Sequence, residues 1–199
     1  MGTIRTLAEP FRFQPPPVKG SRFIATVAPA STAEAAMAQV DAVRGAMPDA
    51  RHHCWAWRLG DGTHRSADDG EPGGSAGRPI LAMIDGHDLV DVVVVVTRYF
   101  GGVKLGVGGL IRAYGGAAGQ ALDRAAIVER EVTVPLTLVH AYDDTQAVAA
   151  VLAAEGLTPR DTVWEAAVRV ALDVPEDRRE AVVRALTDRT AGRARFDEG

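Results

Sequence analysis

The 199-residue sequence has a single cysteine, no long apolar run and no excess of positive charge. One cysteine, Cys54, excludes an intrachain disulfide and is typical of a reducing compartment. The first 18 residues lack an apolar core and are interrupted by prolines, so we expect no secretory signal. The valine run from Val92 to Val96 is too short to span a bilayer. These absences predict a soluble, cytoplasmic protein that does not enter the membrane.

Charge is distributed unevenly along the chain. The net charge is −4 and the isoelectric point is near 5.7, so no global basic field attracts nucleic acid. Residues 1–128 contain 13 Lys and Arg against 12 Asp and Glu, whereas residues 129–199 contain 9 against 14. We therefore expect any polyanionic partner to bind the first part of the chain.

The first part of the chain has clear strand and helix patterns. Apolar residues alternate with polar ones in two segments, and a third is a valine run typical of a strand buried on both faces. These patterns predict strands over 21–28, 51–59 and 91–98, and helices over 31–47, 75–84 and from Leu110 onward. Prolines predict an irregular lead-in over 1–18, and the polar composition of 60–74 predicts a long loop.

The remaining residues predict a different order of strands and helices. Their patterns predict strands over 132–142, 157–163, 165–174 and 191–196, and helices over 143–155 and 175–187. The resulting β-α-β-β-α-β order is that of a ferredoxin-like unit. We place the boundary near Val128, so the predicted fold is α+β, with a first domain over 1–128 and a second over 129–199.

The densest motif is a glycine-rich segment that follows the valine strand and leads into a helix. Glycines let a backbone approach a ligand, and the free N–H groups at a helix start favour an anion. The candidate RNA- or anion-binding residues are Arg98, Gly101, Gly102, Lys104, Gly108, Gly109 and Arg112. The segment matches neither the P-loop nor the dinucleotide fingerprint. An alternative is that the glycines only permit tight packing of strand, turn and helix.

An acidic segment forms a second group of candidates. Its carboxylates could hold a hard cation, and two histidines precede it on the strand over 51–59. Asp and Glu beside Gly and Pro are also common turn and cap residues, which is the interpretation we favour. The secondary candidates are His52, His53, Asp68, Asp69, Glu71 and Arg78.

The strand over 51–59 offers no convincing catalytic group. Its alternation places His53, Trp55 and Trp57 on one face and Cys54 on the other. We expect His53 to lie between the sheet and a second layer, and Cys54 to be a small buried side chain. Zinc spacing and a Ser-His-Asp elbow are both absent from the sequence. We therefore predict no catalytic residue, no metal and no cofactor.

Several of these segments resemble the YigZ/IMPACT family, in the same order along the first domain. The resemblance is carried by 19–25 (KGSRFIA), 52–56 (HHCWA), 68–72 (DDGEP), 76–80 (AGRPI) and 98–114. It implies a first domain like domain 2 of ribosomal protein S5 and a second like the ferredoxin-like C-terminal part of elongation factor G. It also implies a translation-associated role and supplies no catalytic residues. The acidic second domain departs from what an RNA-clamping domain should look like.

Three functional hypotheses follow. The leading one is a non-enzymatic protein that binds RNA, the ribosome or a ribosome-associated factor, with Arg98, Lys104 and Arg112 contacting phosphate. The alternative is a small-molecule or nucleotide-phosphate-binding enzyme that uses the glycine-rich and acidic segments. A third is a protein–protein adaptor that uses the acidic second domain. The oligomeric state is not indicated.

Overall fold

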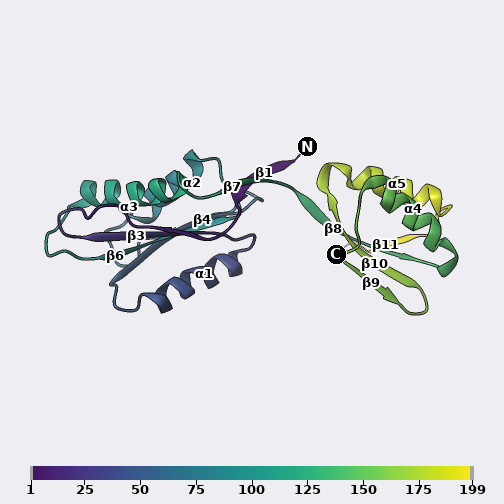
Figure 1. Ribbon diagram of the computed structural model, residues 1–199, viewed down its shortest axis with the longest axis horizontal. Helices are drawn as coiled ribbons and strands as arrows, with labels where there is room; N and C mark the ends of the chain where they lie inside the picture. Colours follow the sequence, from purple (N-terminus) through teal and green to yellow (C-terminus); the bar gives the residue numbers. More distant parts are fainter. Residues whose placement is uncertain (1, 198–199) are drawn as a thin grey trace. The chain divides into compact units, whose positions relative to one another are not determined.

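The computed structural model describes residues 2–197 and divides the chain into two compact units, each with its own sheet (Figure 1). One unit is Ile4–Arg130, and the other contains the described residues from Glu131 onward together with those before Ile4. The mixed α+β class is confirmed. The predicted domains over 1–128 and 129–199 include residues 1 and 198–199, which lie outside the described residues. No helix in the described part of the chain has the length and apolarity needed to cross a membrane.

The first unit is built on a five-stranded antiparallel sheet with the order β2-β3-β6-β4-β5. Its strands are β2 (Phe11–Phe13), β3 (Arg22–Pro29), β6 (Val92–Tyr99), β4 (His52–Arg58) and β5 (His64–Ala67). The central strand β6 carries the valine run, and all five valines are buried. This confirms the prediction of a strand covered on both faces.

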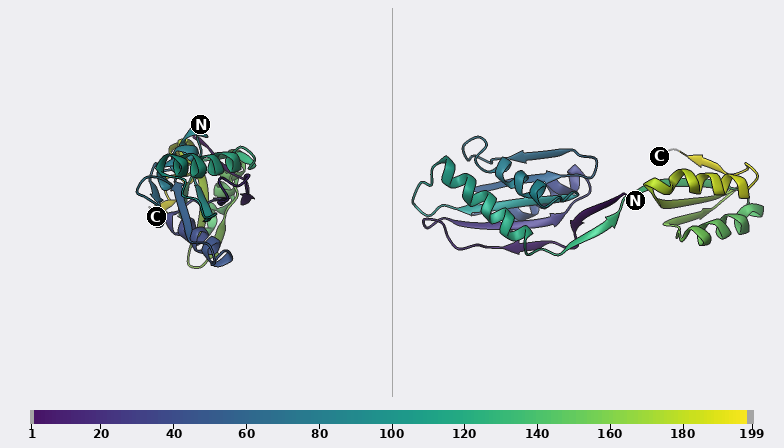
Figure 2. Two further views of the ribbon diagram at one scale, coloured as in Figure 1. Left: turned by 90° about the vertical axis from the view of Figure 1, so that its left-hand side faces the viewer. Right: turned by 90° about the horizontal axis from the view of Figure 1, so that it is seen from above.

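Helices cover both faces of this sheet. Helix α1 (Ala33–Ala46) lies on one face, and α2 (Gly77–Gly86) and α3 (Val107–Leu122) lie on the other (Figures 1 and 2). Strand β4 contributes alternately to the two cores. Cys54 packs with α2 and α3, whereas Trp55 packs with α1, as the period-2 pattern predicts.

Two predictions about the first unit are wrong. The lead-in over 1–18 is not irregular throughout, because it contains β1 (Thr3–Leu7), which pairs with β7 (Ile127–Glu131), and also β2. The predicted loop over 60–74 contains β5, a polar edge strand paired to β4. These strands are short and lie at sheet edges or in the two-stranded β1-β7 sheet, and they lack the apolar alternation that identifies a half-buried strand.

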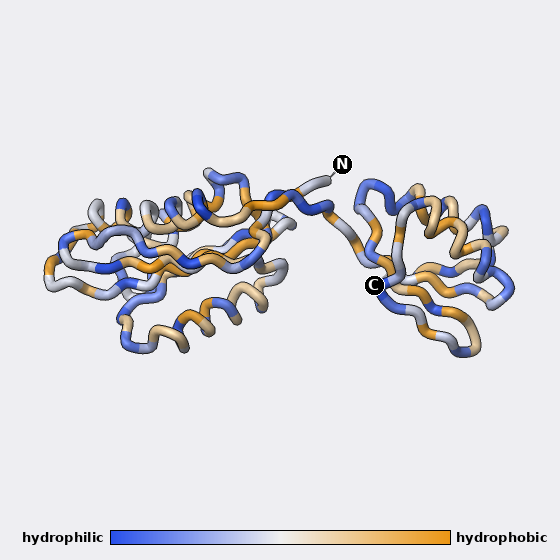
Figure 3. The backbone as a smooth tube through the Cα atoms, in the orientation of Figure 1, coloured by the Kyte–Doolittle hydropathy of each residue, from blue (hydrophilic) through white to orange (hydrophobic). Residues whose placement is uncertain are grey.

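The second unit has a four-stranded sheet with the order β11-β8-β10-β9. Its strands are β8 (Thr133–His140), β9 (Asp161–Trp164), β10 (Val168–Pro175) and β11 (Arg195–Asp197). Helices α4 (Thr145–Glu155) and α5 (Arg179–Arg189) pack on it through a separate core, each preceded by a short 3-10 turn. The chain order is therefore β-α-β-β-α-β, as predicted. Pro175 ends β10 rather than beginning a helix, which corrects one predicted boundary. Figure 3 shows that hydrophobic colouring is concentrated in the central strands of each unit.

Candidate functional site

The glycine-rich segment leaves β6 and turns sharply before it enters α3. At Gly101 the chain passes directly against the turn before β3, so a Cβ atom there would overlap backbone atoms of Gly20 and Ser21. The Gly101 N–H donates to Ser21 Oγ at 3.1 Å. Gly102 follows with a φ of 87°, a conformation that side chains disfavour. Two of the predicted glycines are therefore required by the path of the turn itself.

Helix α3 begins without a side-chain cap. Gly106 occupies the N-cap position and offers no side chain to the first free N–H groups of the helix. These groups and the helix dipole favour a negative charge at this end. Gly108 lies in the exposed first turn of α3. The start of α3 is thus accessible to an anionic ligand.

Two adjoining pockets lie at this end of α3. We name them the Lys104 pocket, about 340 Å³, and the Lys19 pocket, about 190 Å³. Leu105 lines both pockets, so they are neighbours. The Lys104 pocket is lined by Glu71, Pro72, Arg98, Phe100, Lys104, Leu105, Gly106, Val107 and Leu110. The Lys19 pocket is lined by Val18, Lys19, Leu105, Gly109, Arg112 and Ala113.

The structure distributes the predicted cations between these pockets. Lys104 and Arg112 are exposed, one in each pocket. Arg98 lines the Lys104 pocket but is only 5% exposed. Its guanidinium lies 2.7 Å from the Glu71 carboxylate and 3.3 Å from Ser21 Oγ. Its Nε has no hydrogen-bond partner among the described residues.

Sequence reasoning missed Lys19 as a site residue. It precedes β3 and lies far from Arg112 in sequence, yet both line the Lys19 pocket. One signal could have identified it: Lys19 and Lys104 are the only lysines among the 22 Lys and Arg of the chain. Both lysines line the adjoining pockets, whereas arginine supplies every other basic side chain.

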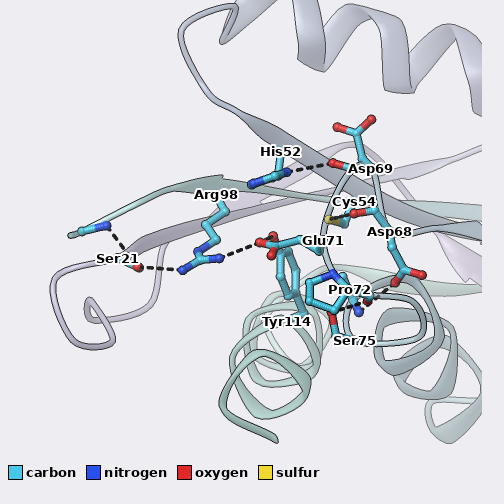
Figure 4. A network of polar contacts seen from close by, with 12 residues as sticks. Ser21, His52, Cys54, Asp68, Asp69, Glu71, Pro72, Ser75, Arg98 and Tyr114 are labelled. Atoms are coloured by element: carbon cyan, nitrogen blue, oxygen red, sulfur yellow. Dashed lines mark hydrogen bonds and ion pairs between the residues drawn. The ribbon is translucent and has the colours of Figure 1, made fainter. Parts of the chain in front are cut away.

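The acidic segment holds the start of α2 in place (Figure 4). The Asp68 carboxylate accepts hydrogen bonds from the backbone N–H groups of Gly74, Ala76 and Gly77, at 2.7, 2.9 and 2.8 Å. Burial by itself would raise the pKa of Asp68, but these three donors outweigh it and the pKa is lowered. Asp68 is therefore committed to a structural role at the beginning of α2.

Asp69 joins the same segment to β4 and α1. Its carboxylate accepts from the His53 N–H at 2.7 Å and lies 3.1 Å from the Arg44 guanidinium. The Asp69 carbonyl lies 2.8 Å from Nδ1 of His52. The His53 ring is buried beside Thr97, and burial lowers the pKa of His53 against the raising effect of the Asp69 carboxylate. The two histidines therefore fasten the acidic segment to the sheet.

Glu71 connects the acidic segment to the glycine-rich segment and α3. Its Oε1 accepts from both Arg98 and the Tyr114 hydroxyl, each at 2.7 Å, and all three side chains meet in Figure 4. The Arg98 and Glu71 side chains are 6% and 5% exposed, so this is a buried ion pair. Arg78 is an exposed residue in the first turn of α2 and is not among the residues lining either pocket. Among residues 2–197, no group of three or more His, Cys, Asp or Glu could hold a metal ion.

Cys54 is fully buried beside this network. Its thiol donates to the Asp68 carbonyl at 3.0 Å. Burial raises the pKa of Cys54 from its ordinary 9.0 to about 12, so the thiolate is scarce near neutral pH. A thiol in this environment packs as a small apolar side chain, as the sequence predicts, and is poorly suited to act as a nucleophile.

Comparison with known families identifies the chain. Residues 19–122, just over half of the sequence, match the Impact N-terminal domain. The chain belongs to the IMPACT family. Residues 138–193 match a domain of unknown function, DUF1949. The Impact match contains all three exposed cations of the pockets and the whole acidic segment.

Individual relatives agree with this assignment. The chain is 42% identical to IMPACT family member YigZ of Escherichia coli over 139 residues, which is 68% of each chain. It is 41% identical to an IMPACT family member of Thermus thermophilus over 177 residues, covering 88% of this chain and 97% of that protein. A crystal structure of a hypothetical protein superposes with a TM-score of 0.77 at 34% identity and covers 98% of this chain and 97% of that one. The similarity therefore extends along almost the full length of the chain.

Proposed function

We propose that the chain is a non-enzymatic, translation-associated protein that binds RNA, the ribosome or a ribosome-associated factor. The observation that carries this proposal is the convergence of Lys19, Lys104 and Arg112 with the uncapped start of α3 on two adjoining pockets. Phosphate groups are held by such exposed cations and helix N-termini. Membership of the IMPACT family supports a role in regulating translation, and we propose the cytoplasm as the place of action.

We propose a different role for Arg98 from the phosphate contact that the sequence predicts. Its charge is balanced by Glu71 in the buried pair, so direct phosphate contact would require that pair to separate. We assign phosphate contact to Lys19, Lys104 and Arg112 instead. Arg98 then has a structural role as part of the wall of the Lys104 pocket.

Two finer fold assignments belong to the same proposal. We propose that the first unit is like domain 2 of ribosomal protein S5 and that the second is like the ferredoxin-like C-terminal part of elongation factor G. The β-α-β-β-α-β order and the β11-β8-β10-β9 sheet support the second assignment. Acidic residues outnumber basic ones by 14 to 9 from residue 129 onward, so the second unit is better suited to a protein partner than to RNA.

Co-sedimentation with ribosomes and with total RNA across a salt series tests the proposal. The native chain is compared with a triple variant, Lys19→Ala, Lys104→Ala and Arg112→Ala. A matched control removes three exposed arginines outside both pockets: Arg51, Arg65 and Arg130. Three phosphate contacts give a slope of about −2 in log affinity against log salt on a single strand.

The triple variant should lose most of the binding and of the salt dependence, and the control should retain both. Equal loss in the two variants would mean that net charge, and not this face, attracts the polyanion. Binding that does not respond to salt would count against phosphate recognition altogether.

The enzyme alternative has less support. Each carboxylate it would use, on Asp68, Asp69 and Glu71, already accepts hydrogen bonds from protein donors. A divalent ion would have to displace these donors to be bound. Titration with magnesium alone should therefore produce no binding heat, and a saturable signal would revive this alternative.

A further inference from the structure

Exposed apolar side chains gather around the two pockets. Phe100, Val103, Val107 and Ile111 are 51%, 49%, 53% and 42% exposed, and Val18 in the Lys19 pocket is 37% exposed. In the described part of the first unit, the one other exposed large apolar side chain is Val128. An apolar patch rimmed by charge marks a place where something binds. The partner must therefore present apolar surface as well as negative charge.

Phe100 is oriented for contact with a flat group. The Arg98 guanidinium carbon lies over its ring, 5.4 Å from the centroid, and Arg98 is itself held by Glu71 and Ser21. About half of the Phe100 side chain nevertheless remains exposed at the Lys104 pocket. A ring that packs against a buried cation and is still half exposed can serve as a platform for stacking.

The walls of the Lys104 pocket are mainly apolar, from Pro72, Phe100, Leu105, Val107 and Leu110, with Lys104 as the exposed charge. A nucleobase has an apolar face and carries its phosphate a short distance away, which fits this combination. A base can enter such a pocket only when it is unstacked, so a double helix is excluded as the ligand. Because Leu105 separates the two pockets, the Lys19 pocket is placed to hold the adjacent phosphate with Lys19 and Arg112.

We infer that this face recognises single-stranded RNA, with one unstacked base in the Lys104 pocket against Phe100 and the next phosphate in the Lys19 pocket. The inference rests on the proposed function and makes it more specific. An acidic, apolar peptide could satisfy charge and apolar contact as well, but it offers no planar group for Phe100. Three exposed cations and one open aromatic ring favour the nucleic acid.

Fluorescence anisotropy of the full chain with three labelled ligands tests the inference. The ligands are a short uridine-rich single strand, an abasic strand of the same length, and an RNA duplex. The abasic strand keeps the phosphates and lacks the base, so it separates stacking from charge. The native chain should bind the base-containing strand about 5- to 150-fold more tightly than the abasic strand, the range that corresponds to one stacked base.

Two substitutions of Phe100 and one control variant locate the effect. Phe100→Ala should reduce this preference to near unity and leave affinity for the abasic strand unchanged, whereas Phe100→Trp should keep the preference. Trp164→Ala, which removes another exposed aromatic side chain in the second unit, should change nothing. Because Phe100 is exposed, circular dichroism should show all three variants folded.

The outcomes distinguish the inference from the proposed function. Equal affinity for the base-containing and abasic strands, or an unaltered preference in Phe100→Ala, would overturn the inference and leave the proposed function standing if binding remains salt-sensitive. Tighter binding of the duplex would also overturn it. If no oligonucleotide binds and an acidic, apolar peptide does, the face serves a protein partner and the RNA part of the proposed function falls as well.

Discussion

At the scale of single residues, Cys54 is a buried thiol whose environment suppresses its chemistry. Burial raises the pKa of Cys54 from 9.0 to about 12, so very little thiolate is present near neutral pH. We expect a disulfide reagent to leave the native protein unmodified and to label one thiol per chain in urea. Measuring labelling at increasing pH checks the cause, because reactivity should rise steeply only in strongly alkaline solution. Rapid labelling of the native protein near pH 7 would contradict this.

The buried pair of Arg98 and Glu71 should be important for stability. Replacing Glu71 by Ala leaves the Arg98 guanidinium buried without its partner and removes the acceptor of the Tyr114 hydroxyl. The expected loss is about 3–5 kcal/mol in the free energy of unfolding, measured by urea titration. Glu71→Gln keeps an acceptor for Tyr114 and should lose less than Glu71→Ala.

Glu9→Gln is the matched control, because Glu9 is exposed and its substitution should change the free energy by no more than about 0.5 kcal/mol. Similar small effects for Glu71→Ala and Glu9→Gln would show that the pair between the two segments contributes little.

At the scale of elements, Asp68 fastens the acidic segment to the start of α2 through three backbone donors. The pKa of Asp68 is lowered in the folded protein, so the carboxylate stabilises the fold above its ordinary value of 3.8 and loses this effect as pH falls through the lower folded value. Asp68→Asn should reduce stability near pH 7 by about 1.5–3 kcal/mol. The difference from the native protein should shrink as pH falls below 3.8, as measured by urea titration at neutral and at acidic pH. A difference that is independent of pH would mean that shape and not charge is responsible.

Two glycines of the glycine-rich segment, Gly101 in the turn after β6 and Gly108 in the first turn of α3, should respond differently to substitution. A Cβ at Gly101 would overlap the backbone at Gly20 and Ser21, whereas a Cβ at Gly108 would meet only the end of the Arg112 side chain at 3.7 Å. Gly101→Ala should therefore lower the melting temperature and cost at least about 1–3 kcal/mol. Gly108→Ala should be neutral or stabilise α3 by up to about 1 kcal/mol. Equal effects in a thermal scan would disprove the close approach at Gly101.

The strands of the first unit show which elements can be predicted from a local sequence pattern and which cannot. Strand β6 is predicted because its valine run is local, and β4 because its alternation is local. Strands β1 and β7 are joined by pairing between the two ends of the first unit, which no local pattern records. The same limit applies to contacts between candidate site residues that are distant in sequence. Arg98 is visible as a cation, but its burial depends on Glu71, 27 residues away in sequence, so its pairing could not be predicted.

At the scale of the whole molecule, the pocket cations and the excess of acidic residues belong to different units. The exposed cations of the two pockets all belong to the first unit, while the excess of acidic residues lies from residue 129 onward. The charge counts alone favour the first part of the chain for a polyanion, and this stays a prediction. The counts could not identify the face, because the cations that define it come from separate segments at 19, 104 and 112.

The two units have separate hydrophobic cores, so we expect them to unfold in separate transitions. Ile80→Ala opens a cavity in the first unit and Leu172→Ala opens one in the second, and both side chains are fully buried. Each should cost about 2–5 kcal/mol and move only the transition of its own unit in calorimetry. Tryptophan fluorescence assigns the transitions, because Trp55 and Trp57 are buried in the first unit and a Trp164→Phe background leaves only those two. If each substitution moved both transitions together, the units would fold as one cooperative body, and binding at the pockets of the first unit would stabilise the second unit as well.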